Sequence, residues 1–184
     1  MSLGTFAPGP YTATYDASGA VSGTPGQAAD PAARDIGLVE GAHRLSRVME
    51  GEDIAGTNLF GQTVVDSIYR GGNCFLLLTM KEWKPYVRDI LWPFGSSFGD
   101  VGPIGRLLTD LAGKIVLTPV AGTPAYQNDG KVLTFGKAIL SPQHNTEIFY
   151  GPAQRDVALV FRCFPYYNSD ETPKLVWFEE SDVE

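Results

Sequence analysis

The stretch VVDSIYRGGNCFLLLTMKEWKPYVRDILW, residues 64–92, decides how the rest of the chain is arranged. Within it, Gly71 and Gly72 separate two runs that are rich in β-branched and large apolar residues. Both central residues of a type I′ turn need φ > 0, which glycine adopts without steric cost, so the pair predicts a tight hairpin turn. Residues 74–80 are apolar at every position except Thr79, which predicts a central strand that is buried on both faces.

A helix is expected directly after this strand. Trp83, Val87, Ile90 and Leu91 recur at helical spacing and form one apolar stripe. Pro93 then ends the helix, because proline has no amide hydrogen to donate and restricts the residue before it. A hairpin with one helix packed on it is the predicted seed of the fold, and it contains no catalytic motif.

The rest of the sequence predicts a mainly β protein of short strands joined by turns. Its 184 residues include 21 glycines and 13 prolines, an excess over ordinary usage that favours turns, and the length suits a single domain, residues 1–184. Ile104 to Leu111 could be a helical turn or a strand, and an irregular segment or a strand is favoured. Further strands are expected at residues 11–15, 35–39, 42–50, 114–120, 132–135, 137–140, 146–150, 157–164 and 175–178, with Gly136 separating the fifth from the sixth.

Two segments are expected to lack strands or helices. Residues 17–34 consist mostly of Gly, Ala, Pro, Ser and Thr, have almost nothing to bury, and are interpreted as a flexible loop or arm. Residues 51–61, GEDIAGTNLFG, are expected to be a long hairpin loop. Apolar residues near its end point to a contact with a partner, and Asn58, Leu59 and Phe60 are the candidate inter-subunit loop contacts. The alternative is that this loop folds back on its own core.

The acidity of the chain is concentrated at its C-terminus. The formal net charge is −7, and residues 166–184 carry six acidic residues and one lysine, which accounts for −5 of it. This acidic C-terminal tail is interpreted as solvated and partly disordered. An acidic protein is poorly suited to grip nucleic acid, because binding requires Lys and Arg to displace the counterions of the phosphates.

No residue pattern predicts catalysis. His43 and His144 lie far apart in the sequence, and neither is accompanied by a second metal ligand at a recognised spacing. Cys74 and Cys163 lie in apolar runs and are expected to be buried, reduced thiols. We therefore expect no catalytic, cofactor-binding or metal-binding residues, no cofactor and no enzymatic activity. No apolar run approaches the roughly 18 residues of a membrane span, so no membrane insertion is expected.

The order of several motifs resembles that of the tail tube (major tail) proteins of long-tailed bacteriophages. The resemblance covers about residues 36–165 and depends most on the DSIYRGGN segment, while residues 17–34 and the acidic tail lie outside it. The motifs are, in order, DIGLVEG (35–41), TVVDSIYRGGNCFLLLTMKEW (63–83), WPF (92–94), GRLL (105–108), TPVAGTP (118–124) and the strand at 155–164.

The resemblance implies a fold of two packed antiparallel sheets, a sandwich or partly closed barrel, with one flanking α-helix and long extended loops. It implies a virion structural protein, assembled in the host cytoplasm, whose hexameric rings stack into a tube. Its partners would be further copies of itself, other phage tail proteins, and double-stranded DNA that passes through the lumen during ejection without specific binding. Long loops would bridge successive rings.

Other functions remain open at this point. The chain could be another tail or neck component, such as a terminator, connector or baseplate tube protein. It could also be a non-catalytic β-sandwich module that binds a sugar or peptide beside an exposed tryptophan, or a hydrolase without a familiar motif.

Overall fold

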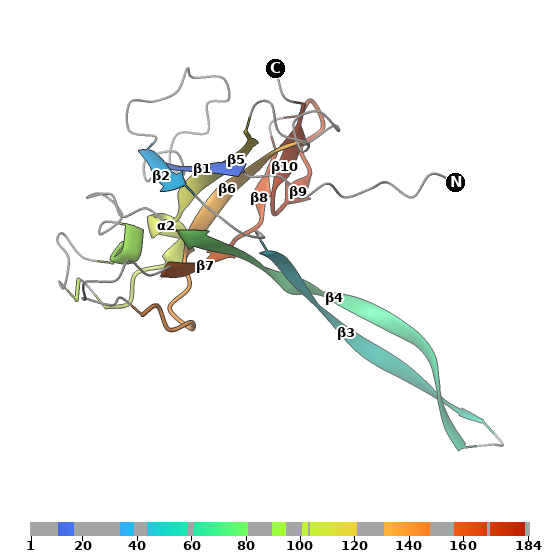
Figure 1. Ribbon diagram of the computed structural model, residues 1–184. Helices are drawn as coiled ribbons and strands as arrows, with labels where there is room; N and C mark the ends of the chain where they lie inside the picture. The colour runs from blue at the N-terminus through green and yellow to red at the C-terminus, as the bar shows by residue number, and fades with distance from the viewer. Residues whose placement is uncertain are drawn as a thin grey trace.

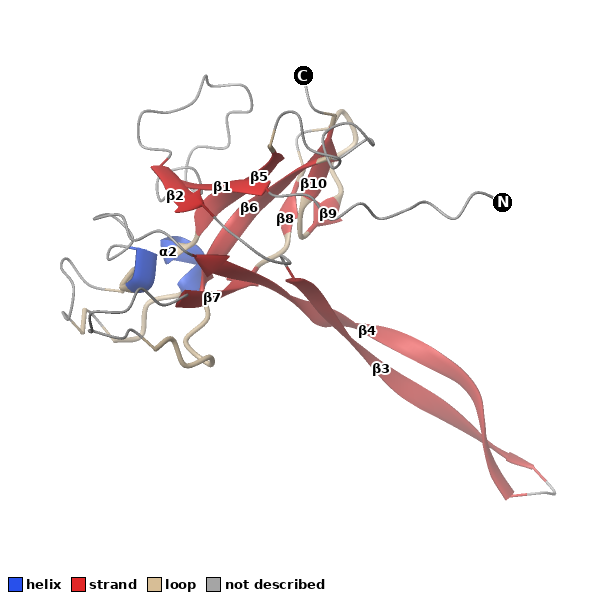
Figure 2. Cartoon of the chain, viewed as in Figure 1, coloured by secondary structure: helices blue, strands red, loops and turns tan. Residues whose placement is uncertain are grey.

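A computed structural model describes residues 11–16, 34–38, 44–58, 61–80, 90–94, 101–102, 104–120, 131–147, 157–168 and 170–182. The protein is mainly β, with a compact body and a long two-stranded arm that leaves it (Figures 1 and 2). Within the described residues the elements with defined bounds are β1 (Tyr11–Asp16), β2 (Arg34–Leu38), β3 (Arg44–Asn58), β4 (Gly61–Met80), α2 (Leu108–Leu111), β5 (Gly113–Pro119), β6 (Val132–Leu140), β7 (Val157–Cys163), β8 (Tyr166–Tyr167), β9 (Leu175–Val176) and β10 (Glu179–Ser181).

The main sheet is antiparallel throughout. Its strand order is β2-β1-β5-β6-β7-β4-β3, and β10 pairs with the first residues of β6, beyond the segment that pairs with β7. Strands β8 and β9 form a second, two-stranded sheet. Although β2 ends the main sheet, it returns into contact with β4, so the sheet curls around one core. The predicted fold class, two antiparallel sheets with a flanking helix, is confirmed.

The core lies on one face of the curled sheet. In β5 and β7 alternate residues are buried, as expected for strands that turn one face to a core. Phe135 and Phe161 are the largest side chains that are fully buried. The core consists of Ala13, Tyr15, Ile36, Cys74, Leu76, Leu78, Met80, Ile90, Leu91, Ile115, Leu117, Phe135, Ala138, Leu140, Val157, Leu159, Phe161 and Cys163.

The prediction of a hairpin turn at Gly71-Gly72 is wrong. Both glycines lie inside β4, which runs unbroken from Gly61 to Met80 and pairs with β3 along almost its whole length. Glu50 pairs with Gly71 but Gly51 pairs with Tyr69, so Arg70 is an extra residue and the site is a β-bulge. Gly71 has φ of 122°, a positive value that glycine adopts without steric cost. A β-bulge can require such a residue just as a type I′ turn does.

The predicted loop at residues 51–61 is also wrong for residues 51–58. These residues continue β3, which is 15 residues long against 20 for β4. At about 3.3 Å per residue, the 15 residues of β3 span roughly 50 Å. The far part of the hairpin therefore projects beyond the body as an arm (Figure 1). We use "arm" for residues 44–58 and 61–73.

The strands expected near residues 11–15, 114–120 and 157–164 are confirmed as β1, β5 and β7. Gly136 does not divide β6, which continues through it. A Cβ at Gly136 would lie 2.7 Å from ring atoms of Tyr166, so this glycine makes room for the tyrosine ring. Residues 108–111 form α2, where an irregular segment or strand was expected.

The C-terminal segment is folded rather than disordered over its described residues. Tyr166 donates a hydrogen bond of 3.0 Å from its hydroxyl to the Thr134 carbonyl oxygen. Phe178 packs on Phe135, with 5.4 Å between ring centroids, and Trp177 also packs against the core. Glu179 is half-buried and the other described acidic side chains are exposed, while β9 and β10 are paired with other strands. Sequence charge alone was therefore a poor guide here.

The predicted helix lies mostly outside the described residues, as do the predicted flexible segment up to residue 33 and residues 148–150. Ile90 and Leu91, at the end of the expected helix, are helical and buried in the core. Thr146 and Glu147, expected to start a strand, are not in one. In β4, Phe75, Leu77 and Thr79 are only half-buried, so its second face is less covered than predicted.

Candidate assembly surface

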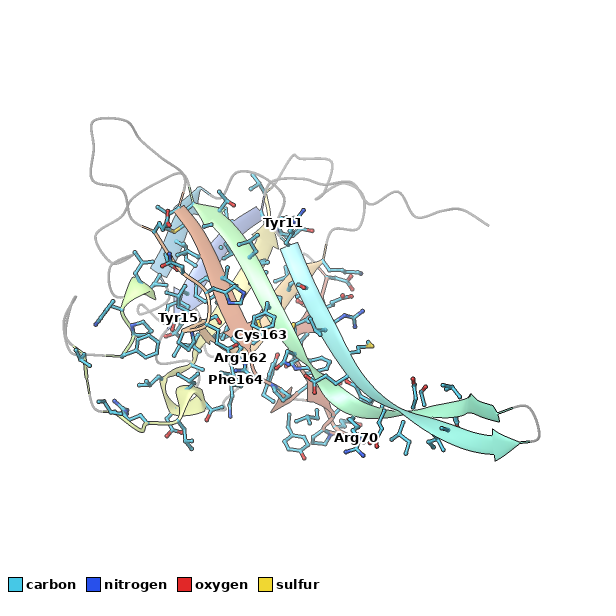
Figure 3. All side chains as sticks on the ribbon, turned by 90° about the horizontal axis from the view of Figure 1, so that it is seen from below. Tyr11, Tyr15, Arg70, Arg162, Cys163 and Phe164 are labelled. Atoms are coloured by element: carbon cyan, nitrogen blue, oxygen red, sulfur yellow. The ribbon has the colours of Figure 1, made fainter. Side chains whose placement is uncertain are left out.

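The arm is joined to the body by a row of polar contacts that crosses three strands. Arg162 of β7 donates a hydrogen bond of 3.0 Å from Nη2 to Asn73 Oδ1 of β4. Asn73 donates from Nδ2 to Glu50 Oε1 of β3, at 3.3 Å. The Arg162 guanidinium also lies over the Phe164 ring, 5.3 Å from its centroid, beside the root of the arm (Figure 3). These contacts link the side chains of β3, β4 and β7 where the arm leaves the body.

Along its length the arm exposes large apolar side chains. Met49 is 62% exposed and Tyr69 is 58% exposed, values far from those of core residues. Isolated apolar residues on a surface are ordinary, but a concentration of them along one element marks a contact surface. The exposed set on the arm is Leu45, Val48, Met49, Ile54, Val64, Ile68 and Tyr69.

The register places these side chains on both faces of the arm. Glu52 pairs with Ile68 and Ile54 with Asp66, so the two isoleucines are diagonal neighbours on one face. The pair next to Ile68 contains Tyr69, which therefore points to the opposite face. A ribbon with apolar side chains on both faces has no face specialised for solvent.

Polar contacts within the arm hold the two strands together without covering its apolar residues. Arg70 forms an ion pair with Glu52, and Ser67 donates a hydrogen bond of 2.6 Å from its hydroxyl to Asp53 Oδ1. All four side chains are exposed to solvent, where such pairs contribute about 0–1 kcal/mol each. An isolated two-stranded hairpin is at best marginally stable in water, so the arm gains most from burial against another surface.

Among the residues that the structure describes, β3 is the last strand of the main sheet and pairs only with β4. Strands at the end of a sheet can pair with a further strand, which is how sheets extend between subunits.

The sequence-predicted contact residues lie at the arm's far end. Asn58 is the last residue of β3 and pairs with Gly61, the first residue of β4. The side chain of Asn58, and the whole of Leu59 and Phe60, lie outside the described residues, so their role as inter-subunit contacts stays a prediction. The exposed residues between Asn58 and the body were not predicted, because the sequence of this ribbon indicated a loop and a separate hairpin. The sequence did contain a signal for this exposed surface. Residues 63–69 have apolar residues at both odd and even positions, and these residues do not follow the spacing of a buried helix.

The described histidine is a structural residue. His144 Nδ1 lies 3.0 Å from the Ser141 hydroxyl, and its ring meets the edge of Phe75 with 5.3 Å between centroids. His43 lies outside the described residues. Among the residues that the structure describes, no group of three or more His, Cys, Asp or Glu side chains is arranged to hold a metal ion. The arm, rather than a cluster of reactive groups, is thus the feature that the geometry singles out.

Comparison with known proteins assigns no family, because neither a protein-family model nor a curated protein matches this chain. Within the described part of the chain, no helix is long and apolar enough to cross a membrane.

Proposed function

We propose that this protein is a structural subunit that assembles with copies of itself, and specifically a tail tube subunit of a long-tailed bacteriophage. Stacked hexameric rings of such subunits would form the conduit through which DNA leaves the virion. The observation that carries the proposal is the projecting arm, which exposes apolar side chains on both faces.

The arm supports self-assembly through its free energy balance. Full burial of a large apolar side chain stabilises a contact by about 1.5–3 kcal/mol. The seven exposed apolar side chains of the arm could therefore contribute several kcal/mol of binding free energy if a partner covered them. A neighbouring copy is a natural partner, since every copy carries both an arm and a body. Subunits that carry the arm on one side and its receptor on another form rings or stacks rather than closed dimers.

The electrostatics are compatible with a DNA conduit. The net charge of −7 disfavours tight binding of phosphates, which a conduit must avoid. The motif order of residues 35–124 and 155–164 supplies the more specific part of the proposal, that the assembly is a phage tail tube. In this role the protein has no catalytic residue and no cofactor, and it acts in the virion after assembly in the host cytoplasm.

A second candidate is a non-catalytic β-sandwich that binds a ligand. Trp177, the tryptophan resolved near the C-terminus, is half-buried and packs against the core rather than standing free beside a groove. No observation therefore favours this alternative over assembly.

Light scattering over a wide concentration series tests the proposal. A tail tube subunit gives a molar mass that grows with concentration towards hexamers and stacks. A mass that stays at one subunit throughout, together with a specific hit on a glycan or peptide array, would favour the ligand-binding module.

A further inference from the structure

The two cysteines of the chain lie opposite each other at the root of the arm. Cys74 of β4 and Cys163 of β7 are register partners in the antiparallel pairing of these strands. Both side chains point to the core face, where both are buried and both are free thiols. Cys163 is labelled beside Arg162 and Phe164 in Figure 3, next to the strand that continues into the arm.

This placement satisfies the geometric demands of a disulfide. Directly opposed residues of antiparallel strands have Cα atoms about 4.5 or 5.5 Å apart, depending on the type of pair. A disulfide requires Cα atoms about 4.4–6.8 Å apart and side chains on the same side, so either type of pair lies within range. The register of the two strands therefore meets the Cα criterion for a disulfide.

The chemistry of the pair is asymmetric. The hydrogen bond with the Cys163 thiol, helped by the positive charge of Arg47, lowers the pKa of Cys74. The same contact and burial raise the pKa of Cys163. Arg47 is the register partner of Cys74 on β3. Arg47 of β3, Cys74 of β4 and Cys163 of β7 therefore lie side by side across three neighbouring strands. The lowered pKa favours the thiolate, the reactive form of cysteine, at Cys74 rather than at Cys163, although burial opposes it.

We propose that Cys74 and Cys163 form a redox-responsive cross-link that fixes the root of the arm to the body. Two S–H bonds break and one S–S bond forms, while an oxidant accepts two protons and two electrons. With a diazenedicarboxamide such as diamide, the N=N bond becomes an NH–NH bond, so atoms and electrons balance. The thiols stay reduced in a reducing cytosol and become oxidised in an oxidising medium.

Closure of the disulfide changes the protein in two measurable ways. The bond closes a loop of about 90 residues, which restricts the unfolded chain strongly and raises the Tm by roughly 10 °C. It also ties β4 to β7 beside Asn73 and Arg162, so amide hydrogens near the arm root exchange more slowly. These effects concern the single subunit and do not depend on its assembly.

The experiment oxidises the full chain by two routes. Folded protein is incubated with diamide, and denatured protein is refolded with oxidised glutathione, which also gives the buried thiols access to oxidant. We expect a monomer that is lighter by two hydrogen atoms, has lost both titratable thiols and melts at a higher temperature until dithiothreitol is added.

A disulfide that forms by either route with a raised Tm supports the inference. Two thiols retained after both routes, a disulfide only between different copies, or a Tm lowered by oxidation would each overturn it. The Cys163→Ser variant serves as the control in which the mass and Tm changes are absent, and the wild-type measurements stand even where this variant does not fold.

Discussion

Replacing exposed apolar residues of the arm should prevent assembly while leaving the fold intact. The variant combines Met49→Thr, Val64→Thr, Ile68→Thr and Tyr69→Thr. Threonine retains the preference for strands, so the arm itself should persist. Because each of these side chains is already more than half exposed, their loss should cost the folded subunit little, within about 0.5 kcal/mol per site.

The effect on assembly follows from the area left exposed. Full burial of such a side chain stabilises by about 1.5–3 kcal/mol, and roughly half of it remains available to a partner. Each site therefore contributes about 1 kcal/mol to a contact, and four sites about 4 kcal/mol. At about 1.4 kcal/mol per tenfold change, each contact between subunits weakens by about a thousandfold.

Sedimentation velocity over a concentration series measures this shift, and urea unfolding checks that the fold is retained. A matched control makes four threonine substitutions on the body, at Val101, Ile104, Leu107 and Leu175, which are exposed to a similar or greater extent. Assembly of the arm variant at wild-type concentrations would refute the reasoning. Equal loss of assembly in the body control would show that general surface hydrophobicity, not the arm, drives association.

Three further predictions concern the single subunit. Gly72→Ala places a Cβ 2.5 Å from the Val48 carbonyl oxygen and should lower the free energy of unfolding by about 1–3 kcal/mol. In Gly51→Ala the nearest atom is 3.6 Å from the new Cβ, so the free energy of unfolding, measured for both variants by urea titration, should change by less than about 0.5 kcal/mol. Tyr166→Phe loses the hydrogen bond to the Thr134 carbonyl and should destabilise by about 1 kcal/mol in thermal melts, with faster proteolysis of the C-terminal segment; unchanged stability would argue against this anchor. Burial raises the pKa of Tyr15 from 10.0 to about 12, so its stabilising contribution is complete below pH 10 and disappears as the pH rises to 12. Urea unfolding across that range should show a smaller fall for Tyr15→Phe than for wild type.

The sequence was most informative where a short apolar run is bounded by turn residues. Such runs at residues 114–120 and 157–164 predicted strands, and β5 and β7 occur there. Residues 157–164 are apolar on both faces in the sequence, but only alternate residues of β7 are buried. The mainly β class and the buried thiols of Cys74 and Cys163 followed from the same signal.

Glycine was the main source of error. Gly71 needs a positive φ both in a tight turn and in a bulge, so the residue pair could not distinguish a chain reversal from a continuous strand. Gly136 similarly resembles a break in a strand, whereas in the structure it accommodates the ring of Tyr166, which is 30 residues away in the sequence. Such tertiary reasons for glycine have no local sequence signature.

The candidate site was only partly predictable for a related reason. Asn58, Leu59 and Phe60 were chosen as the apolar end of a loop, and Asn58 indeed ends β3 at the far end of the arm. The exposure of Met49 and Ile68 was not predicted, because apolar residues in a strand normally indicate burial. Their exposure is a property of the arm's projection beyond the core, which depends on long-range pairing.

Negative-stain electron microscopy of concentrated wild-type protein, with the four-site arm variant imaged beside it, tests most directly whether the arm drives self-assembly. We expect rings and stacked tubes in the wild-type images and single subunits in those of the variant. Single subunits for both proteins at every concentration reached, or identical rings from both, would contradict the role proposed for the arm.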